Sequence, residues 1–260
     1  MPRSDATRVI APDVPRDVAV PIATGTVRLT DDPDGSTTVW VNEVPSSSMR
    51  LDPTVLDFEY MRHFAAAIAA WGPPAKLLAL HAGAGVCTMA RHLSHAYPDS
   101  RHIAVDIDTT LPDLARQWWD LPRAPQLRVR AQDGSAAVVE RHDDSLDLIL
   151  RDAFAGDSTP VSMADEHWWT HARRVVRPGG LVLANVKYVP QQRNHAPDVA
   201  AARAIFRDVV AVGEPAVLKG KRRGNVVIVA SDGIDLDALR RYAASAPLPT
   251  GVDPSWPGQR

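Results

Sequence analysis

The sequence lacks the features that would point to a membrane, a disulfide or a nucleic-acid surface. It has one cysteine in 260 residues, so an intramolecular disulfide is excluded. No apolar run reaches the roughly 18 residues of a membrane-spanning helix, and the N-terminal segment shows no apolar signal-peptide core. The net charge of −2 argues against a broad basic face. We therefore expect a cytoplasmic protein with no membrane and no nucleic acid as partner.

Patterns typical of metal sites are also scarce. His167 and His171 stand at positions i and i+4, so they could share a helix face as ligands, but no HExxH motif is present. A packed helix that buries Trp168 and Trp169 explains the same segment, and we expect no metal. The basic residues 219–224, KGKRRG, could touch nucleic acid, although such a turn is more often solvated.

The composition, 45% hydrophobic, is sufficient for one large α/β domain with a small appendage. Alternating apolar residues around a DDPDGS turn predict a β-hairpin, and helical spacing begins at Asp52 and ends at Gly72. We expect four segments along the chain: a flexible N-terminus at 1–17, a β-hairpin domain at 18–50, an α/β nucleoside-binding domain at 51–246, and an irregular tail at 247–260.

Within the large domain, apolar strands alternate with helical segments, which predicts right-handed crossovers and a mostly parallel sheet. Two final strands, placed at 216–218 and 225–230, are expected to form an antiparallel hairpin at one edge. The predicted fold is α/β: a Rossmann-like, seven-stranded S-adenosylmethionine-dependent methyltransferase fold preceded by the hairpin domain. The other strands are expected at 77–80, 103–105, 127–129, 146–150 and 181–186.

The most informative stretch is residues 76–108, where a strand leads into a glycine turn, a helix and a second strand. Gly83 and Gly85 would let the backbone approach a ligand, and Asp106 would accept hydrogen bonds from ribose hydroxyls. Asp106 follows Gly85 by 21 positions, close to the roughly 20 of dinucleotide-binding units. The third glycine of G-x-G-x-x-G is absent. A plain turn, with Asp106 as a helix cap, is the alternative.

Further acidic residues follow other predicted strands. Asp133 and Gly134 could face an adenine, or form an ordinary turn. Asp152 comes straight after the strand LDLIL, where a carboxylate can hold a cationic amine or accept its proton. Asp157 lies five residues further on. Loop solvation or helix capping is the alternative for each of these acids, and it is favoured for Asp157 more than for Asp152. Because ligands of open parallel sheets bind at the carboxyl ends of strands, we expect these residues on one rim.

These segments together resemble a known family. The order glycine turn, VDID, QDGSA, DLILRDAF, GDSTP and RPGGLVLANV is similar to the spermidine synthase (polyamine aminopropyltransferase) family, and more so to its spermidine-synthase-like relatives. The resemblance covers roughly residues 37–232. It implies a transferase of polyamine biosynthesis that uses decarboxylated S-adenosylmethionine, or S-adenosylmethionine, as co-substrate with a small-molecule amine acceptor. A homodimer is expected.

The resemblance also implies roles for individual residues. Asp152 matches the catalytic aspartate that orients the attacking amine and aids its deprotonation. Asp106 would contact the donor ribose, Asp133 and Gly134 would face its adenine, and Gly83 and Gly85 would form the turn beside it. Tyr60 and Asp157 would bind the amine substrate.

Several departures from the family pattern concern the amine and the donor tail. HAGAG stands where the family has GGGDG, so an acidic residue of the donor site is missing. Asp157 is five rather than three residues after Asp152, and Arg62 replaces a carboxylate. Asn185 stands where many synthases have Gln. Three functions therefore remain open: aminopropyl transfer, S-adenosylmethionine-dependent methyl transfer, and non-catalytic adenosine binding on the same fold.

Overall fold

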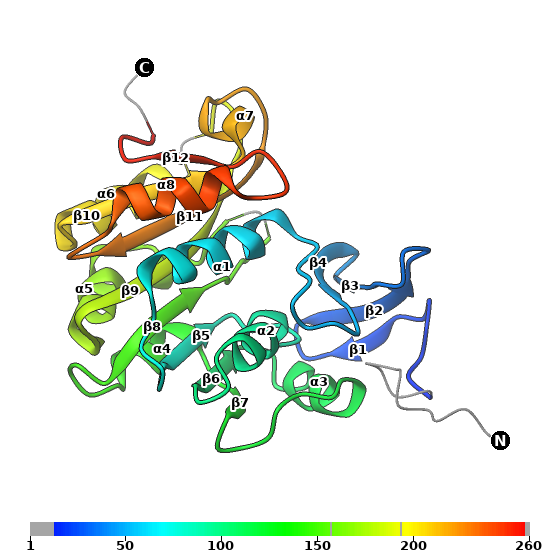
Figure 1. Ribbon diagram of the computed structural model, residues 1–260. Coiled ribbons are helices and arrows are strands. Elements are labelled where there is room, and N and C mark those ends of the chain that lie inside the picture. Colours follow the sequence, from blue (N-terminus) through cyan, green and yellow to red (C-terminus); the bar gives the residue numbers. More distant parts are fainter. Residues whose placement is uncertain (1–12, 157, 193, 258–260) are drawn as a thin grey trace.

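The computed structural model describes residues 13–156, 158–192 and 194–257, which form two sheets side by side (Figure 1). The smaller sheet is antiparallel and precedes the larger one in the chain. Each of its strands pairs with the next in sequence, as expected for successive hairpins. Its strands are β1 (Val20–Ile22), β2 (Gly25–Asp31), β3 (Thr37–Val41) and β4 (Val44–Met49).

The larger sheet has the order β12-β10-β11-β9-β8-β5-β6-β7. Strands β5 to β9 pair in parallel, while β11 runs antiparallel to both β9 and β10. This arrangement confirms the predicted Rossmann-like fold with its antiparallel pair at one edge. The strands are β5 (Leu78–Ala82), β6 (Arg101–Asp106), β7 (Leu127–Ala131), β8 (Leu146–Arg151), β9 (Val176–Tyr188), β10 (Asp208–Gly213), β11 (Gly224–Ser231) and β12 (Gly251–Asp253).

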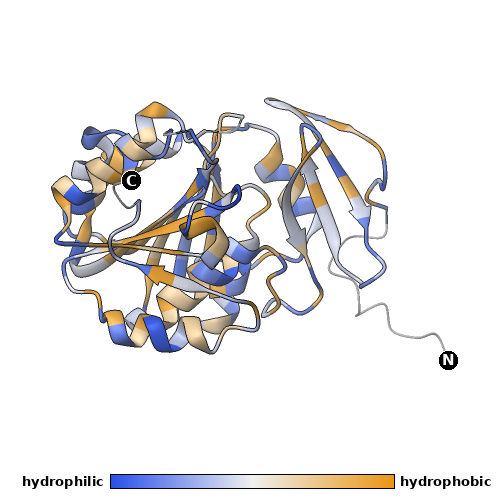
Figure 2. Cartoon of the chain, turned by 90° about the horizontal axis from the view of Figure 1, so that it is seen from above, coloured by the Kyte–Doolittle hydropathy of each residue, from blue (hydrophilic) through white to orange (hydrophobic). Residues whose placement is uncertain are grey.

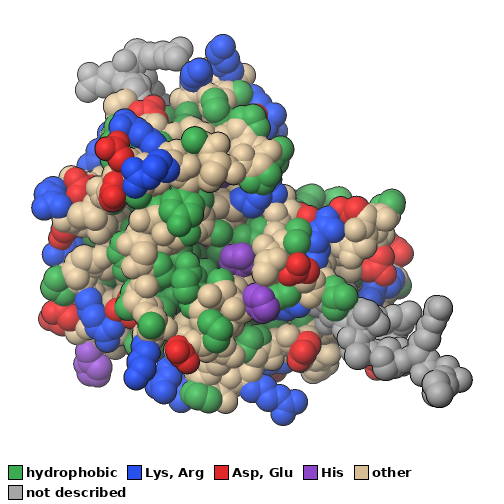
Figure 3. Space-filling model, in the orientation of Figure 1, with side chains coloured by type: hydrophobic (Ala, Val, Ile, Leu, Met, Phe, Trp, Pro, Cys, Tyr) green, Lys and Arg blue, Asp and Glu red, His purple; other side chains and the backbone are tan. Residues whose placement is uncertain are grey.

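Helices cover both faces of this sheet, and its apolar strands run between them (Figure 2). One face packs against α4, α5 and α6, and the other against α1, α2 and α8. Around α1 the outer surface keeps many hydrophobic side chains (Figure 3). The helices are α1 (Glu59–Trp71), α2 (Thr88–Ala96), α3 (Leu111–Trp118), α4 (Gly134–Val139), α5 (Glu166–Val175), α6 (Ala196–Ile205), α7 (Pro215–Leu218) and α8 (Leu236–Ala244).

Helix α1 shows how local sequence sets the position of the site. Tyr60, Phe64, Ala67 and Ile68 recur at helical spacing and are buried against the sheet. Gly72 then takes a left-handed conformation with φ of 70°, and its N–H donates to the Ile68 carbonyl, which ends the helix. Helix α1 packs on β9, β10 and β11, and Glu59 in its first turn accepts from Asn225 on β11.

Two details differ from the sequence prediction. Residues 216–218 belong to helix α7, so their placement as a strand was wrong; the strand is β10, which is rich in valine and starts eight residues earlier. Pro215 at the first helical position favours the helix there. The tail, expected to be irregular, contains β12, which pairs with β10 and adds an eighth strand.

The predicted boundary between the two domains, near residue 50, stays a prediction. Most of the segment 1–17 lies outside the described residues. Within the described part of the chain, no helix is both long and apolar enough to cross a bilayer.

Candidate functional site

The glycine turn after β5 brings two strand ends into close approach. Gly83 has φ of 83°, and a Cβ there would lie 2.5 Å from the Asp152 carbonyl oxygen, so a larger residue cannot fit without moving that backbone. Gly85 also has a positive φ, 51°, but a Cβ there would meet nothing within 4 Å. Gly83 is therefore needed for packing, and Gly85 borders open space that a ligand could occupy.

Asp106, at the end of β6, is held by backbone donors. The N–H of Gly85 donates to its Oδ2 at 2.8 Å, and the N–H of Asp108 donates to its Oδ1 at 3.0 Å. Burial raises the pKa of Asp106, although these hydrogen bonds favour the ionised form. The predicted glycine turn and the predicted carboxylate therefore lie together as one unit.

The helix-capping alternative proposed for Asp106 describes Asp108 instead. Oδ1 of Asp108 accepts from the N–H groups of Thr110 and Leu111 at the start of α3, at 2.7 Å each. Its Oδ2 accepts from the N–H and hydroxyl of Thr24, at 2.7 and 2.8 Å. Asp108 thus ties the turn between β1 and β2 to the large sheet beside Asp106.

Asp133 and Gly134 start helix α4 beyond β7. Asp133 is the exposed N-cap, and its Oδ1 accepts from the Ala136 N–H at 2.8 Å. Gly134 is buried, and a Cβ there would lie 2.8 Å from Met163 and 3.2 Å from Ala82. The structure therefore gives this pair a capping and packing role, and their contact with an adenine stays a prediction.

Asp152 follows β8 and is held by two side chains from distant segments. Asn185 on β9 donates from Nδ2 to Oδ1 of Asp152 at 2.9 Å, and the Tyr60 hydroxyl hydrogen-bonds the same carboxylate. Burial raises the pKa of Asp152 to about 6, although both hydrogen bonds favour its ionised form. A carboxylate that titrates near neutral pH suits proton transfer.

Asn185 contributes a further polar atom to this site. Its Oδ1 is buried and has no hydrogen-bond partner among the described residues. An unsatisfied buried acceptor is costly, so a donor on a bound ligand would relieve it. Sequence reasoning compared Asn185 with the Gln of the family, but this acceptor is a property of the folded site alone.

Tyr60 lies in the first turn of α1 and packs edge-on against Phe64, with ring centroids 5.8 Å apart. Burial, and then the neighbouring Asp152, raise the pKa of its hydroxyl. The nearby cation of Arg62 is bound to main-chain carbonyls: Nη1 donates to those of Leu56 and Asp57, at 2.7 and 2.5 Å. Arg62, which stands where the family has a carboxylate, therefore fixes the segment before α1 to the first turn of the helix.

The remaining candidates are weaker. Asp157 lies outside the described residues. His167 and His171 have ring centroids 4.6 Å apart, but among the residues described no three His, Cys, Asp or Glu side chains form a metal-binding group. Trp168 and Trp169 are fully buried, in agreement with core packing. Sequence reasoning missed Glu59, whose Oε1 accepts from Asn225 on β11 at 3.4 Å; no motif marks either residue.

The strand order is that of the S-adenosylmethionine-dependent methyltransferase class of α/β folds. A probable spermidine synthase from Corynebacterium glutamicum matches the chain with a TM-score of 0.85 and 32% identity, covering 94% of this chain and 92% of that one. The chain belongs to the spermidine synthase family. Human methyltransferase-like protein 13, in complex with SAH, shares the fold at TM-score 0.58 and 17% identity, covering 72% of this chain and 93% of that one.

Curated sequences agree with this family. A polyamine aminopropyltransferase from Neisseria meningitidis is 26% identical over 222 residues, 82% of this chain and 80% of that protein. A probable polyamine aminopropyl transferase from Bifidobacterium longum is 32% identical over 111 residues, 43% of this chain. The match spans only 24% of that longer protein. No protein-family model matches the chain.

Proposed function

We propose that this protein is an aminopropyltransferase, which moves the aminopropyl group of decarboxylated S-adenosylmethionine to a small-molecule amine. The observation that carries the proposal is Asp152, a carboxylate with a pKa of about 6, oriented by Tyr60 and Asn185 in a chain of the spermidine synthase family. Membership alone does not require such a carboxylate. Its retention where the family has its catalytic aspartate supports catalysis over mere binding.

The reaction is a displacement at the carbon attached to the sulfonium. The nitrogen lone pair of the amine forms the new C–N bond while the C–S bond breaks, and its electron pair stays on sulfur, leaving methylthioadenosine. The acceptor enters as an ammonium ion, so it must lose one proton before this lone pair is available. Asp152 accepts that proton and passes it to solvent, and the alkylated product leaves as a substituted ammonium ion. Holding the two substrates in line is the larger contribution to the rate, because it replaces a bimolecular encounter.

The donor half of the site would consist of the glycine turn, Asp106 and the start of α4. Asp106 would accept hydrogen bonds from the two ribose hydroxyls with oxygens that Gly85 and Asp108 already orient. The open space beside Gly85 leaves room for the nucleoside to approach the backbone. Asp133 and Gly134 would border the adenine.

The acceptor half would consist of Asp152, Asn185 and Tyr60. An ammonium group beside Asp152 could donate one hydrogen bond to that carboxylate and another to the unsatisfied Oδ1 of Asn185. Tyr60 would fix the carboxylate through its hydroxyl. We also propose Asp157 as an amine ligand, on its likeness to the second acid of the family. A cytoplasmic homodimer completes the proposal.

The test is methylthioadenosine release from decarboxylated S-adenosylmethionine with putrescine, cadaverine and spermidine as acceptors. Release that depends on an amine supports transfer. Absence of release with every amine would contradict the proposal. Calorimetry with methylthioadenosine, performed on the same preparation, shows whether the donor half is intact.

Methyl transfer from intact S-adenosylmethionine is the second candidate, and one position favours it. Ala84 stands where the family has the acidic residue of GGGDG, so the donor's amino tail lacks that carboxylate partner. A donor that keeps its own carboxylate would suffer less repulsion there. Tighter calorimetric binding of S-adenosylmethionine than of its decarboxylated form would favour this candidate.

A further inference from the structure

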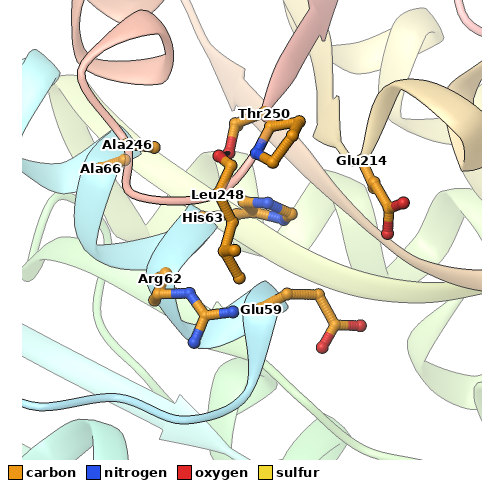
Figure 4. Close-up of a pocket in the computed structure, with 9 residues that line it drawn as sticks. Glu59, Arg62, His63, Ala66, Glu214, Ala246, Leu248 and Thr250 are labelled. Atoms are coloured by element: carbon orange, nitrogen blue, oxygen red, sulfur yellow. Dashed lines mark hydrogen bonds between the residues drawn. The ribbon is translucent and has the colours of Figure 1, made fainter.

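A pocket lies at the first two turns of α1, the helix that also carries Tyr60 of the proposed acceptor half. Its volume is 170 Å³, and the segment 246–250 before β12 lies over it. Figure 4 shows His63 and this segment at its centre, with Glu59 and Arg62 below and Glu214 to one side. No motif in the sequence predicts this pocket, because its walls come from α1, the end of β10 and the tail.

His63 supplies the most informative atom of the pocket. It is 4% exposed, and its Nδ1 has no hydrogen-bond partner in the described part of the chain. Burial lowers the pKa of His63 to about 4, so the ring is neutral at pH 7. A neutral imidazole has one nitrogen that can accept, and a buried acceptor without a donor is relieved by a ligand N–H.

The other walls suit a cation on an aliphatic chain. Glu59 and Glu214 are carboxylates at the rim, and Ala66, Leu248 and Pro249 give apolar surface. The cations nearby are already engaged. Arg62 donates to main-chain carbonyls. Arg222 pairs with Glu214, so an ammonium group in the pocket would share that carboxylate with Arg222.

Glu59 connects this pocket to Asp152. It precedes Tyr60, whose hydroxyl hydrogen-bonds Asp152, and its charge acts on both Tyr60 and His63. On the sheet, Glu59 accepts from Asn225 of β11, two residues from Val227, which pairs with Asn185. Asn185 and Asn225 thus lie two positions apart on neighbouring strands and on one face of the sheet, Asn185 beside Asp152 and Asn225 beside Glu59.

We propose that this pocket binds the distal ammonium group and adjoining methylene chain of a long polyamine acceptor whose reacting amine lies at Asp152. The ammonium group donates to His63 Nδ1 and to the carboxylates of Glu59 and Glu214, and the methylene groups pack on Leu248 and Pro249. The assignment rests on the proposed aminopropyl transfer and makes the enzyme selective for acceptor length.

The test compares Glu59→Gln and Glu214→Gln with the parent over acceptors of increasing length, from propylamine to putrescine and spermidine. Loss of a charge-assisted hydrogen bond raises KM for spermidine about tenfold, with kcat and the propylamine KM unchanged. Glu166→Gln is the matched control, since Glu166, like Glu59, is the first residue of its helix. Equal spermidine KM in the parent and both pocket variants overturns the proposal, as does an equal rise for propylamine.

Calorimetry with spermidine in the presence of methylthioadenosine separates this inference from the proposed function. If the parent releases no methylthioadenosine with any amine, aminopropyl transfer fails, but Glu59-dependent and Asp152-dependent spermidine binding still supports the pocket. Equal spermidine affinity in Glu59→Gln and the parent overturns the assignment of this pocket. Glu59-dependent binding that persists unchanged in Asp152→Asn shows a free amine in the pocket, and overturns its assignment to the acceptor's distal end.

Discussion

The two halves of the proposed site are built in different ways. The ribose side of the donor half comes from one continuous stretch, in which the glycine turn, Asp106 and Asp108 follow each other from β5 to the end of β6 and bond through the main chain. The acceptor half brings together Tyr60, Asp152 and Asn185 from three segments and bonds through side chains. The first can persist while the sequence around it changes; the second depends on each of its residues.

The departures from the family pattern fall on both sides: Arg62, Asp157 and Asn185 on the acceptor side and Ala84 in the glycine turn. A backbone N–H is present whatever the side chain, so the contacts that orient Asp106 survive substitution of their donors. A hydroxyl or an amide disappears with its residue. We therefore expect substitutions in the acceptor half to alter catalysis and those in the donor half to alter affinity or folding.

The largest expected effect is that of Asp152→Asn. Removing the proton acceptor should lower transfer about 10²–10⁴-fold, the range typical of a general base, while nucleoside binding is kept. Methylthioadenosine release measures the first quantity and calorimetry the second. Parallel loss of both would show that Asp152 supports the fold of the donor half rather than the chemistry.

Gly83→Ala should be the most damaging change to folding in the donor half. The new Cβ would lie 2.5 Å from the Asp152 carbonyl oxygen at a positive φ, and we expect a loss of about 2–4 kcal/mol in the free energy of unfolding. Gly85→Ala is the control, because its Cβ meets open space and only the left-handed backbone costs about 1 kcal/mol. Urea denaturation gives the free energy of unfolding of both variants. A larger loss of stability in Gly85→Ala than in Gly83→Ala would contradict the prediction.

Asp106→Ala should weaken nucleoside binding at least tenfold, because charge-assisted hydrogen bonds contribute about 1.5–3 kcal/mol each. Calorimetric titration with methylthioadenosine gives the dissociation constant. Asp133→Ala, at the exposed N-cap of α4, provides a comparison on the same rim. Equal affinity in the Asp106 variant and the parent would remove this carboxylate from the donor half.

The smallest effect concerns pH. Because the pKa of Asp152 is raised to about 6, its ionised form is lost below that value, and transfer should fall about tenfold per pH unit there. The residual rate of Asp152→Asn should not fall in this way below pH 6. The comparison therefore separates titration of Asp152 from titration of the amine substrate. The raised pKa means that the carboxylate favours folding when protonated, so its contribution to stability is lost as pH rises through about 6.

The alternation of strands with helices, and the places of the glycine turn, Asp106 and Asp152 at strand ends, could be predicted from the sequence because they depend on local pattern. Apolar runs alternate with helical spacing, and the glycine turn, Asp106 and Asp152 stand at strand ends where a parallel sheet gathers them. The strands at the antiparallel edge of the sheet were harder to predict. A short apolar run at 216–218 resembles a strand, while Pro215 and the valines of β10 decide the outcome.

The acceptor half could be predicted only in part. Asp152 is visible as an acid after an apolar strand, but its pKa depends on burial and on Tyr60 and Asn185, far away in the chain. The unsatisfied Oδ1 of Asn185, and Nδ1 of His63, are consequences of packing. The spacing of residues in a sequence cannot predict that a buried polar atom will have no hydrogen-bond partner.

The bridge made by Asp108 has a consequence for communication between the two sheets. Asp108 donates from its main chain to Asp106 and accepts from Thr24 in the turn between β1 and β2, so Asp106, the proposed ribose ligand, and the small sheet share one residue. Coupling of this kind is reciprocal: if a nucleoside at Asp106 strengthens the docking of the small sheet, docking strengthens nucleoside binding by the same free energy. The amide proton of Thr24 would then exchange with solvent more slowly when the site is filled, reporting occupancy from outside the site.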